Sequence, residues 1–236
     1  MINNILFQAV LFLSNTLQTV TGFAGTLLAM PFSIRLVGVE QAKAVLNIFT
    51  MAACFLITVQ NRKYIDRKIL VRMIGGMLVG MLAGIWLFQR IPLQILLKLY
   101  ALLIIFIALK KMFCKKEIPM PSWAMPVILL GAGIIHGMFI SGGALLVVYA
   151  VNVLKDKETF RATIAPVWVI LNAILCVSHY RSGYYTADTL VVTGFSMIPL
   201  VFSIAAGNFI YKKVSQRQFL QITYILLLIA GVSLIL

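Results

Sequence analysis

Two segments of the sequence place glycines and hydroxyl side chains inside long uncharged stretches. The first is TGFAGTLLAMP (21–31), within the charge-free stretch 3–34, and the second is GMFISGGALLV (137–147), within the charge-free stretch 118–154. Glycine lets the backbone leave helical geometry and approach a ligand closely. A helix that restarts after such a break presents unpaired N–H groups and the positive end of its dipole. The chemistry that we expect from these segments is the binding of a small anion.

The candidate binding residues are those that two such breaks would bring to a central cavity. The glycines let backbone N–H groups approach the ligand, the hydroxyl side chains add donors, and polar residues of the flanking helices line the cavity. The predicted substrate-binding set is Gln18, Thr19, Thr21, Gly22, Phe23, Gly25, Thr26, Asn47, His136, Gly137, Phe139, Ser141, Gly142, Gly143 and Asn172.

Some of these residues have a second interpretation. His136 is the only ionisable side chain that the pattern places well inside an apolar segment, and it fits a functional group or a neutral, hydrogen-bonded histidine equally well. Asn47 and Asn172 fit hydrogen bonding between helices as well as lining of the cavity. Phe23 and Phe139 fit a gate or a hydrophobic plug.

The composition indicates an integral membrane protein. Of 236 residues, 62% are hydrophobic and 11% are charged, and the mean hydropathy is +1.03. The net charge of +14 lies in short loops between apolar runs, so topology and anionic lipids explain it better than nucleic acid does. No carboxylate lies inside an apolar run, which argues against a carboxylate proton relay. The scattered cysteines lack metal or redox spacing, and the sequence predicts no metal, no cofactor and no catalytic residue.

The charged residues divide the chain into apolar runs that predict an all-α membrane fold. Two runs are too long for one crossing and contain glycines, so we expect hairpins at 3–38 and 123–154. The other runs are close to the length of about 20 residues that a spanning helix needs. The predicted spans are 42–60, 70–89, 92–112, 161–180, 188–211 and 217–236.

The two halves of the sequence resemble each other. With an offset of 118 residues, GTLLAMP (25–31) aligns with GALLVVY (143–149), and Lys43 aligns with Arg161. With an offset of 123, GIWLFQRI (84–91) aligns with GNFIYKKV (207–214). The sequence therefore predicts about eight membrane segments in two inverted repeats, each a glycine-broken hairpin followed by three spanning helices. The predicted repeats are residues 1–114 and 115–236.

The basic residues favour hairpins over single broken crossings. If each long run crosses once, the 20 Lys and Arg residues divide equally between the two sides of the membrane. If each run returns to its own side, 15 of them fall on one side and five on the other. The positive-inside rule therefore predicts the hairpin arrangement, with both termini in the periplasm.

These segments resemble the TauE/SafE sulfite exporter family. The resemblance rests on the tip TGFAG with its following proline, on GMFISGGALLV, and on duplicated halves over essentially the whole chain. It implies a secondary transporter, in the bacterial inner membrane, that exports small sulfur-containing anions such as sulfite or organosulfonates. Such a protein would use alternating access around an anion site at the two hairpin tips. The implied partners are the small anionic substrate and the lipid bilayer, without nucleic acid, and a homodimer is left open.

Three other functions remain open at this stage. A passive anion channel or a transporter of another small solute would show the same hydropathy and charge pattern. An intramembrane serine protease would need Ser141 and His179 within hydrogen-bonding distance of each other. His179 and Arg181 are expected in a solvated boundary instead, whereas Ser141 is expected deep in the membrane.

A reporter enzyme that is active only in the periplasm tests the predicted topology. Fused after Leu236 it should be active, and inserted at Lys116 it should be inactive, because the basic loops stay in the cytoplasm. A silent fusion after Leu236, together with an active insertion at Lys116, would show that the sidedness is reversed.

Overall fold

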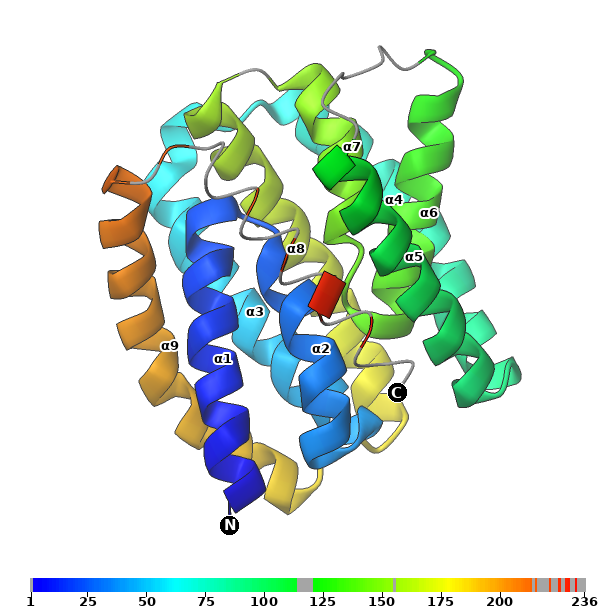
Figure 1. Ribbon diagram of the computed structural model, residues 1–236, viewed down its shortest axis with the longest axis vertical. Coiled ribbons are helices and arrows are strands. Elements are labelled where there is room, and N and C mark those ends of the chain that lie inside the picture. Colours follow the sequence, from blue (N-terminus) through cyan, green and yellow to red (C-terminus); the bar gives the residue numbers. More distant parts are fainter. Residues whose placement is uncertain are drawn as a thin grey trace.

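The computed structural model describes residues 2–113, 121–154 and 156–213, together with residues 215, 221, 225, 228, 229 and 232. Regular structure in these residues is helical (Figure 1). The helices are α1 (Ile2–Thr21), α2 (Ala24–Val37), α3 (Val39–Asn61), the short 3₁₀ helix η1 (Arg62–Tyr64), α4 (Arg67–Arg90), α5 (Leu93–Phe113), α6 (Ala124–Phe139), α7 (Gly143–Val153), α8 (Lys157–Arg181) and α9 (Ala187–Lys213).

Five of the described helices are long and apolar enough to cross a membrane. They are α3 with η1, α4, α5, α8 and α9, and they coincide with five of the six predicted spans. The sixth predicted span, 217–236, lies almost entirely outside the described residues. Helices α2, α6 and α7 are apolar but shorter, with 14, 16 and 11 residues. At 1.5 Å per residue, α7 is only about 17 Å long and is too short to cross the hydrocarbon layer alone.

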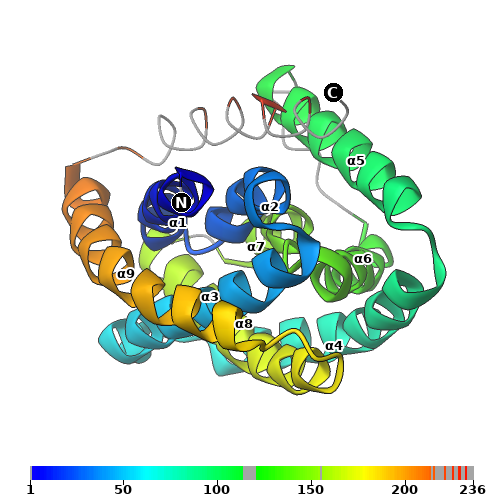
Figure 2. The same ribbon diagram turned by 90° about the horizontal axis from the view of Figure 1, so that it is seen from below.

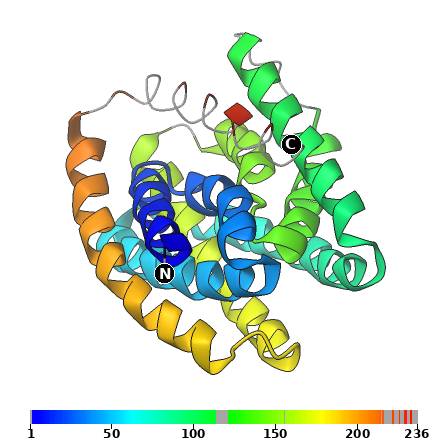
Figure 3. The same cartoon turned by 60° about the horizontal axis from the view of Figure 1, so that its bottom comes forward.

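Helices α1 and α2 form one hairpin and α6 and α7 form another, and the two enter the bundle from opposite ends (Figure 1). The N-terminus and the junctions α2–α3, α4–α5 and α8–α9 lie at one end, and the junctions α3–α4 and α7–α8 lie at the other. We call the latter the basic end, because η1 and the first residues of α4 supply Arg62, Lys63, Arg67 and Lys68 there. Seen along the bundle, α2 and α7 lie in the middle (Figure 2), and α9 and α5 lie at opposite edges (Figure 3).

Both hairpins reverse at a residue with left-handed backbone geometry. In the first, Gly22 has φ +83° and its N–H donates to the carbonyl of Gln18 over 2.6 Å. In the second, Ile140 has φ +57° and its N–H donates to the carbonyl of His136 over 2.7 Å. Glycine adopts this geometry freely, whereas a β-branched residue is strained by it. The two residues are 118 positions apart, which is the offset of the sequence repeat.

Helices α4 and α6 pack backbone to backbone through glycines spaced four residues apart. A Cβ atom at Gly80 or Gly84 of α4 would overlap the carbonyl oxygen of Leu130 or Ile134 in α6. A Cβ atom at Gly137 would likewise overlap the carbonyl oxygen of Met81. Close approach of this kind favours helix association in membranes. Gly137, which we predicted as a binding residue, therefore serves the contact between α6 and α4.

Helix α1 is held against α9 in a comparable way. A Cβ atom at Gly207 of α9 would lie 2.5 Å from Cβ of Thr19 and 2.8 Å from the carbonyl oxygen of Thr16. The amide of Asn15 donates to the hydroxyl of Ser203 over 2.7 Å. The hairpin near the start of the chain is thus packed against a helix near its end.

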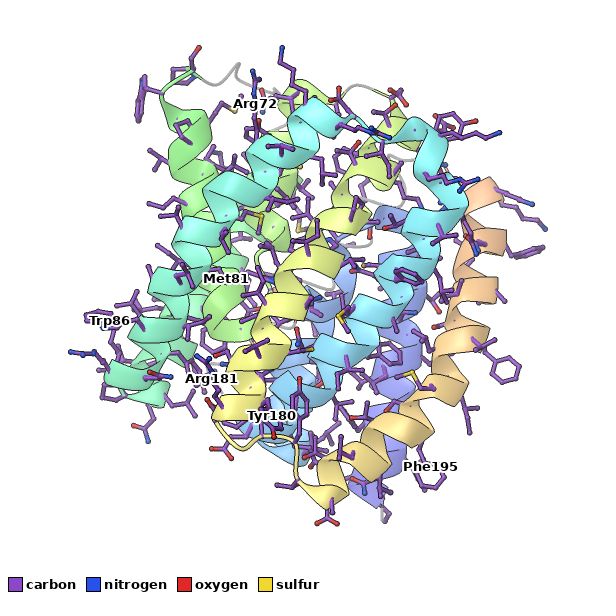
Figure 4. The ribbon with its side chains drawn as sticks, turned by 180° about the vertical axis from the view of Figure 1, so that it is seen from behind. Arg72, Met81, Trp86, Tyr180, Arg181 and Phe195 are labelled. Carbon is purple, nitrogen blue, oxygen red and sulfur yellow. The ribbon has the colours of Figure 1, made fainter. Side chains whose placement is uncertain are left out.

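The outer surface of the bundle is apolar. Trp86 of α4 and Phe195 of α9 are 52% and 64% exposed, and both point away from the bundle (Figure 4). Exposed apolar side chains in such numbers are typical of a surface that faces lipid. The helix lengths, the hydropathy and this surface agree in indicating a multi-pass membrane protein.

Replacing Gly80 by alanine should destabilise the fold, because the new Cβ overlaps the backbone of α6. Overpacking of this kind costs about 1–3 kcal/mol. Thermal unfolding of purified protein measures the loss, and Gly75→Ala is the matched control because a Cβ at Gly75 meets nothing within 4 Å. Equal melting temperatures for the two variants would contradict the packing of α4 on α6.

Candidate functional site

The tips of the two hairpins contact each other in the middle of the bundle. A Cβ atom at Gly143, the first residue of α7, would lie 2.6 Å from the carbonyl oxygen of Phe23. The hydroxyl of Ser141 donates to the carbonyl of Thr26 over 3.2 Å and to that of Phe139 over 2.8 Å. All five residues are buried. The residues around the two breaks, which we predicted as one binding region, are therefore neighbours.

The start of α2 is occupied by side chains of its own hairpin. The N–H of Gly25 donates to Oε1 of Gln18 over 2.6 Å, and the N–H groups of Phe23 and Ala24 donate to the hydroxyl of Thr21 over 3.3 and 3.2 Å. We expected these N–H groups to be open to a ligand. In this structure Gln18 and Thr21 cap the helix instead, since unpaired N–H groups are costly inside a membrane.

The start of α7 is different: its N-cap residue, Gly142, has no side chain, and within the described residues no side chain accepts a hydrogen bond from its first N–H groups. The carbonyl of Gly142 accepts the N–H of Leu146 over 3.1 Å. A Cβ at Gly142 would lie 3.0 Å from Cβ of His136. His136 is 118 positions after Gln18, which caps the other hairpin. The positive end of α7 therefore meets a histidine where α2 meets a capping amide.

His136 and Asn172 are fully buried, and their side-chain polar atoms make no hydrogen bond of standard geometry within the described residues, although the two side chains lie close enough to interact with each other. Asn47 donates to the carbonyl of Asn172 over 3.0 Å and to Sγ of Cys176 over 3.1 Å, while its own carbonyl oxygen accepts no such hydrogen bond. Buried polar groups are normally paired, so unpaired ones are typical of a place that receives water or a ligand. Of the predicted residues, these three fit a binding role best.

Trp168 of α8 is a site residue that sequence reasoning did not identify. Its indole N–H donates to the carbonyl of Gly22 over 2.7 Å, and its ring lies 5.1 Å from that of His136. Gln18 also donates to the carbonyl of Gly22, over 3.3 Å. Trp168 thus connects the backbone of one hairpin tip with the histidine of the other. Its type and spacing gave no signal, because a tryptophan in a spanning helix is equally typical of packing.

The aromatic residues at the tips fill space between helices. The ring of Phe139 stacks on that of Tyr100 at 4.6 Å and meets that of Phe88 edge-on at 6.0 Å. Phe139 is completely buried and Phe23 is 3% exposed. In this structure Phe139 therefore acts as a hydrophobic plug between α6, α5 and α4. Thr19 is completely buried and lies against Gly207 of α9, and its hydroxyl has no described partner.

Three cationic or ionisable side chains near helix ends are buried, among them His179, which we expected in a solvated boundary. Lys43, Arg161 and His179 are 3%, 5% and 2% exposed. Nη2 of Arg161 donates to the side-chain oxygen of Asn208 over 2.8 Å, and its guanidinium lies over the ring of Tyr211. All three lie near an end of their helix, so they add buried ionisable groups close to the ends of α3 and α8, whereas His136 lies in α6. The alignment of Lys43 with Arg161 was the signal that could have identified two of these residues.

The geometry gives no support to a serine nucleophile. The hydroxyl of Ser141 donates to two backbone carbonyls, and His179 lies beside the rings of Tyr184 and Tyr185 at 5.4 and 6.4 Å. A serine that attacks a carbonyl would donate its proton to a base.

Removal of the Gln18 amide tests the cap on α2. Gln18→Met keeps the length and loses the acceptor, so the N–H of Gly25 is left unpaired at a cost of about 1–3 kcal/mol. Gln18→Glu keeps an acceptor for this N–H and should retain more of the stability. Thermal unfolding of both proteins beside the wild type measures the difference, and an unchanged midpoint in Gln18→Met would refute the cap.

Comparison with known proteins identifies the family. The family description "Sulfite exporter TauE/SafE" matches residues 7–234, which is nearly the whole chain. No curated protein and no solved structure matches the chain significantly. A membrane fold of apolar helices, with buried polar groups between two hairpin tips, is consistent with a transporter. The match over nearly the full length shows that the chain belongs to the TauE/SafE family of sulfite exporters, a family of membrane transporters.

Proposed function

We propose that this protein is a secondary transporter that exports small sulfur-containing anions such as sulfite or short organosulfonates. The substrate would bind between the two hairpin tips, at the start of α7. The binding residues would be His136, Asn172 and Asn47, together with backbone N–H groups of Gly143 and its neighbours. The family match supports an anion exporter, and the choice among sulfur anions is our own inference.

One observation carries the proposal more than any other. Within the described residues no side chain caps the start of α7, and Gly142 there packs against Cβ of the buried His136. The polar atoms of His136 and Asn172, which lie close to each other, make no hydrogen bond of standard geometry in this part of the chain. A helix N-terminus favours an anion, by up to about 2 kcal/mol in a partly buried setting. Neutral imidazole and amide groups can donate further hydrogen bonds to its oxygens. Together these groups suit an oxyanion of low charge that is bound weakly enough to be released.

The duplicated plan supports alternating access as the mechanism. The hairpins enter from opposite ends, and their reversals at Gly22 and Ile140 share left-handed geometry and the repeat offset. Two inverted halves around one site can exchange conformations, which opens the site to each side in turn. We propose residues 1–114 and 115–236 as these halves, although part of the second half lies outside the described residues.

The distribution of basic residues supports one orientation of the protein in the membrane. The basic end would face the cytoplasm, and the N-terminus and the junction α8–α9 would face the periplasm of a bacterial inner membrane. Export would then carry the anion from the basic end to the opposite end.

A charge introduced at the hairpin tips tests the anion site. Thr26 is 6% exposed and its carbonyl accepts the hydroxyl of Ser141, so a carboxylate at this position lies close to the start of α7. Thr26→Asp should abolish sulfite binding by repulsion, and Thr26→Val, which has nearly the same shape, should only weaken it. Calorimetry with sulfite on purified protein measures both.

The controls separate this function from its alternatives. Equal sulfite affinity in the wild type and Thr26→Asp would reject the tip site. Counterflow in proteoliposomes, in which unlabelled sulfite drives uptake of labelled sulfite, is expected of a transporter with alternating access. Sulfite flux that rises linearly with concentration and shows no counterflow would indicate a passive channel instead.

A further inference from the structure

A second region of the structure has the features of an anion site and lies away from the hairpin tips. It is a small cavity near the end of the bundle opposite the basic end. It lies between the start of α3 and the ends of α4 and α8. The space that the centre of a water molecule can occupy there is about 10 Å³, which is enough for about one water. Its lining residues are Lys43, Ile85, Phe88, Gln89, Gly137, Leu175, Ser178, His179, Ser182 and Tyr184.

Lys43 and His179 form the buried floor of this cavity. The ammonium of Lys43 lies 3.5 Å from the centre of the Phe88 ring and 5.9 Å from that of Tyr184. Both nitrogens of His179 are buried and have no hydrogen-bond partner within the described residues. A buried cation held by ring faces keeps its N–H donors available for an anion.

The rim of the cavity is polar, and the nearest acidic side chain, Glu40, lies outside the lining but close enough for its charge to act on Lys43 and Tyr184. Gln89 and Ser182 are exposed, so the cavity opens toward the opposite end, and none of its ten lining residues is acidic. The acidic residue nearest to Lys43 in the sequence is Glu40, one turn earlier in α3, and it is exposed. Burial and the charge of Glu40 raise the pKa of Tyr184, so its phenol stays neutral and can donate a hydrogen bond.

A cation–aromatic contact also lies at the repeat-related position at the basic end, where the Tyr211 ring is shared with Lys157 at 3.7 Å. Arg161 of α8 lies 4.5 Å from the centre of the Tyr211 ring of α9. Arg161 follows Lys43 by 118 residues, and Tyr211 follows Phe88 by 123, which are the two offsets of the sequence repeat. Arg161 also approaches the first hairpin tip, since a Cβ at Gly22 would lie 3.7 Å from its Cα. In the same way, Lys43 is near the second hairpin, because Gly137 of that hairpin lines the cavity that Lys43 also lines.

We propose that Lys43 and His179 form an anion-binding subsite between the hairpin tips and the opposite end, and that Arg161 is its counterpart at the basic end. Because the cavity has room for only about one water in this conformation, an anion that leaves the tips would reach the ammonium of Lys43 once the surrounding helices move apart, before it is released. Arg161 is held by the amide of Asn208 and by Tyr211, whereas Lys43 faces a cavity. Of these two repeat-related cations, the one that lines a cavity is thus on the side to which the proposed export leads.

The subsite can be tested with thiol reagents that differ only in charge. In a background without native cysteines, Ser182→Cys places a thiol at the rim, and Thr186→Cys places one in the same loop outside the cavity. The probes are the anionic sulfonatoethyl and the cationic trimethylammonioethyl methanethiosulfonates. We expect the ratio of anionic to cationic reaction rates to be several-fold higher at Ser182→Cys than at Thr186→Cys. Millimolar sulfite should slow the anionic reaction at Ser182→Cys alone.

Substitution of the lysine identifies the source of this selectivity. Lys43→Met should lower the rate ratio at Ser182→Cys by roughly tenfold, which corresponds to about 1.4 kcal/mol. Lys43→Arg should preserve the ratio, and Lys98→Met, the same change at an exposed lysine of α5, should leave it unaltered. A ratio that Lys43→Met does not change would overturn the subsite. If Lys43→Met fails to fold, the test uses the protein that keeps Lys43. Equal rate ratios at Ser182→Cys and Thr186→Cys in that protein would overturn the subsite.

The subsite rests on the proposed function only for the direction of travel and the choice of sulfite as competitor. Counterflow of sulfite in proteoliposomes, without selectivity that depends on Lys43, would keep the transport function and reject the subsite. Selectivity that depends on Lys43, in a protein that shows no flux of any sulfur anion, would keep the subsite and reject the function.

Discussion

The pairing of backbone polar groups within the bilayer is the constraint on which the rest of this structure depends. Two hairpins interrupt helices inside the membrane, and each interruption frees N–H and C=O groups that lipid cannot satisfy. At the first tip several freed groups are engaged: Gln18 and Thr21 accept the N–H groups at the start of α2, and Trp168 and Gln18 donate to the carbonyl of Gly22. Neighbouring side chains therefore had to be polar, although they lie in apolar helices.

The second tip meets the same constraint only in part, and this difference gives the molecule a candidate site. His136 replaces the capping Gln18 at the corresponding position, and no side chain of the described residues caps α7. Asn172 likewise stands where the first half has Cys54, which accepts a hydrogen bond from Gln18 over 3.3 Å. The polar atoms of His136 and Asn172 make no hydrogen bond of standard geometry within the described residues. A fold that satisfies one tip internally and leaves the other to an incoming group is suited to reversible binding.

Close packing between the hairpins and the long helices sets how precisely this site is held. The glycines of α4 bring its backbone against α6, and Gly207 brings α9 against α1, so each hairpin is packed against a spanning helix from the other part of the chain. Small residues let helices approach closely without large side chains between them. A rigid movement of either hairpin would consequently shift the helix on which it packs, which is the coupling that alternating access needs.

The sequence by itself determined the features that follow from local composition and periodicity. Hydropathy and charge spacing predicted the all-helical membrane class and five of the six spans, because each span must match the bilayer on its own. The glycines predicted that residues 21–31 and 137–147 break their helices. Only the tertiary structure decided which breaks are capped, that Gly137 serves packing, and that Lys43, Arg161 and His179 are buried. Those properties depend on which distant side chain arrives beside each group, and residue type and spacing along one helix do not contain that information.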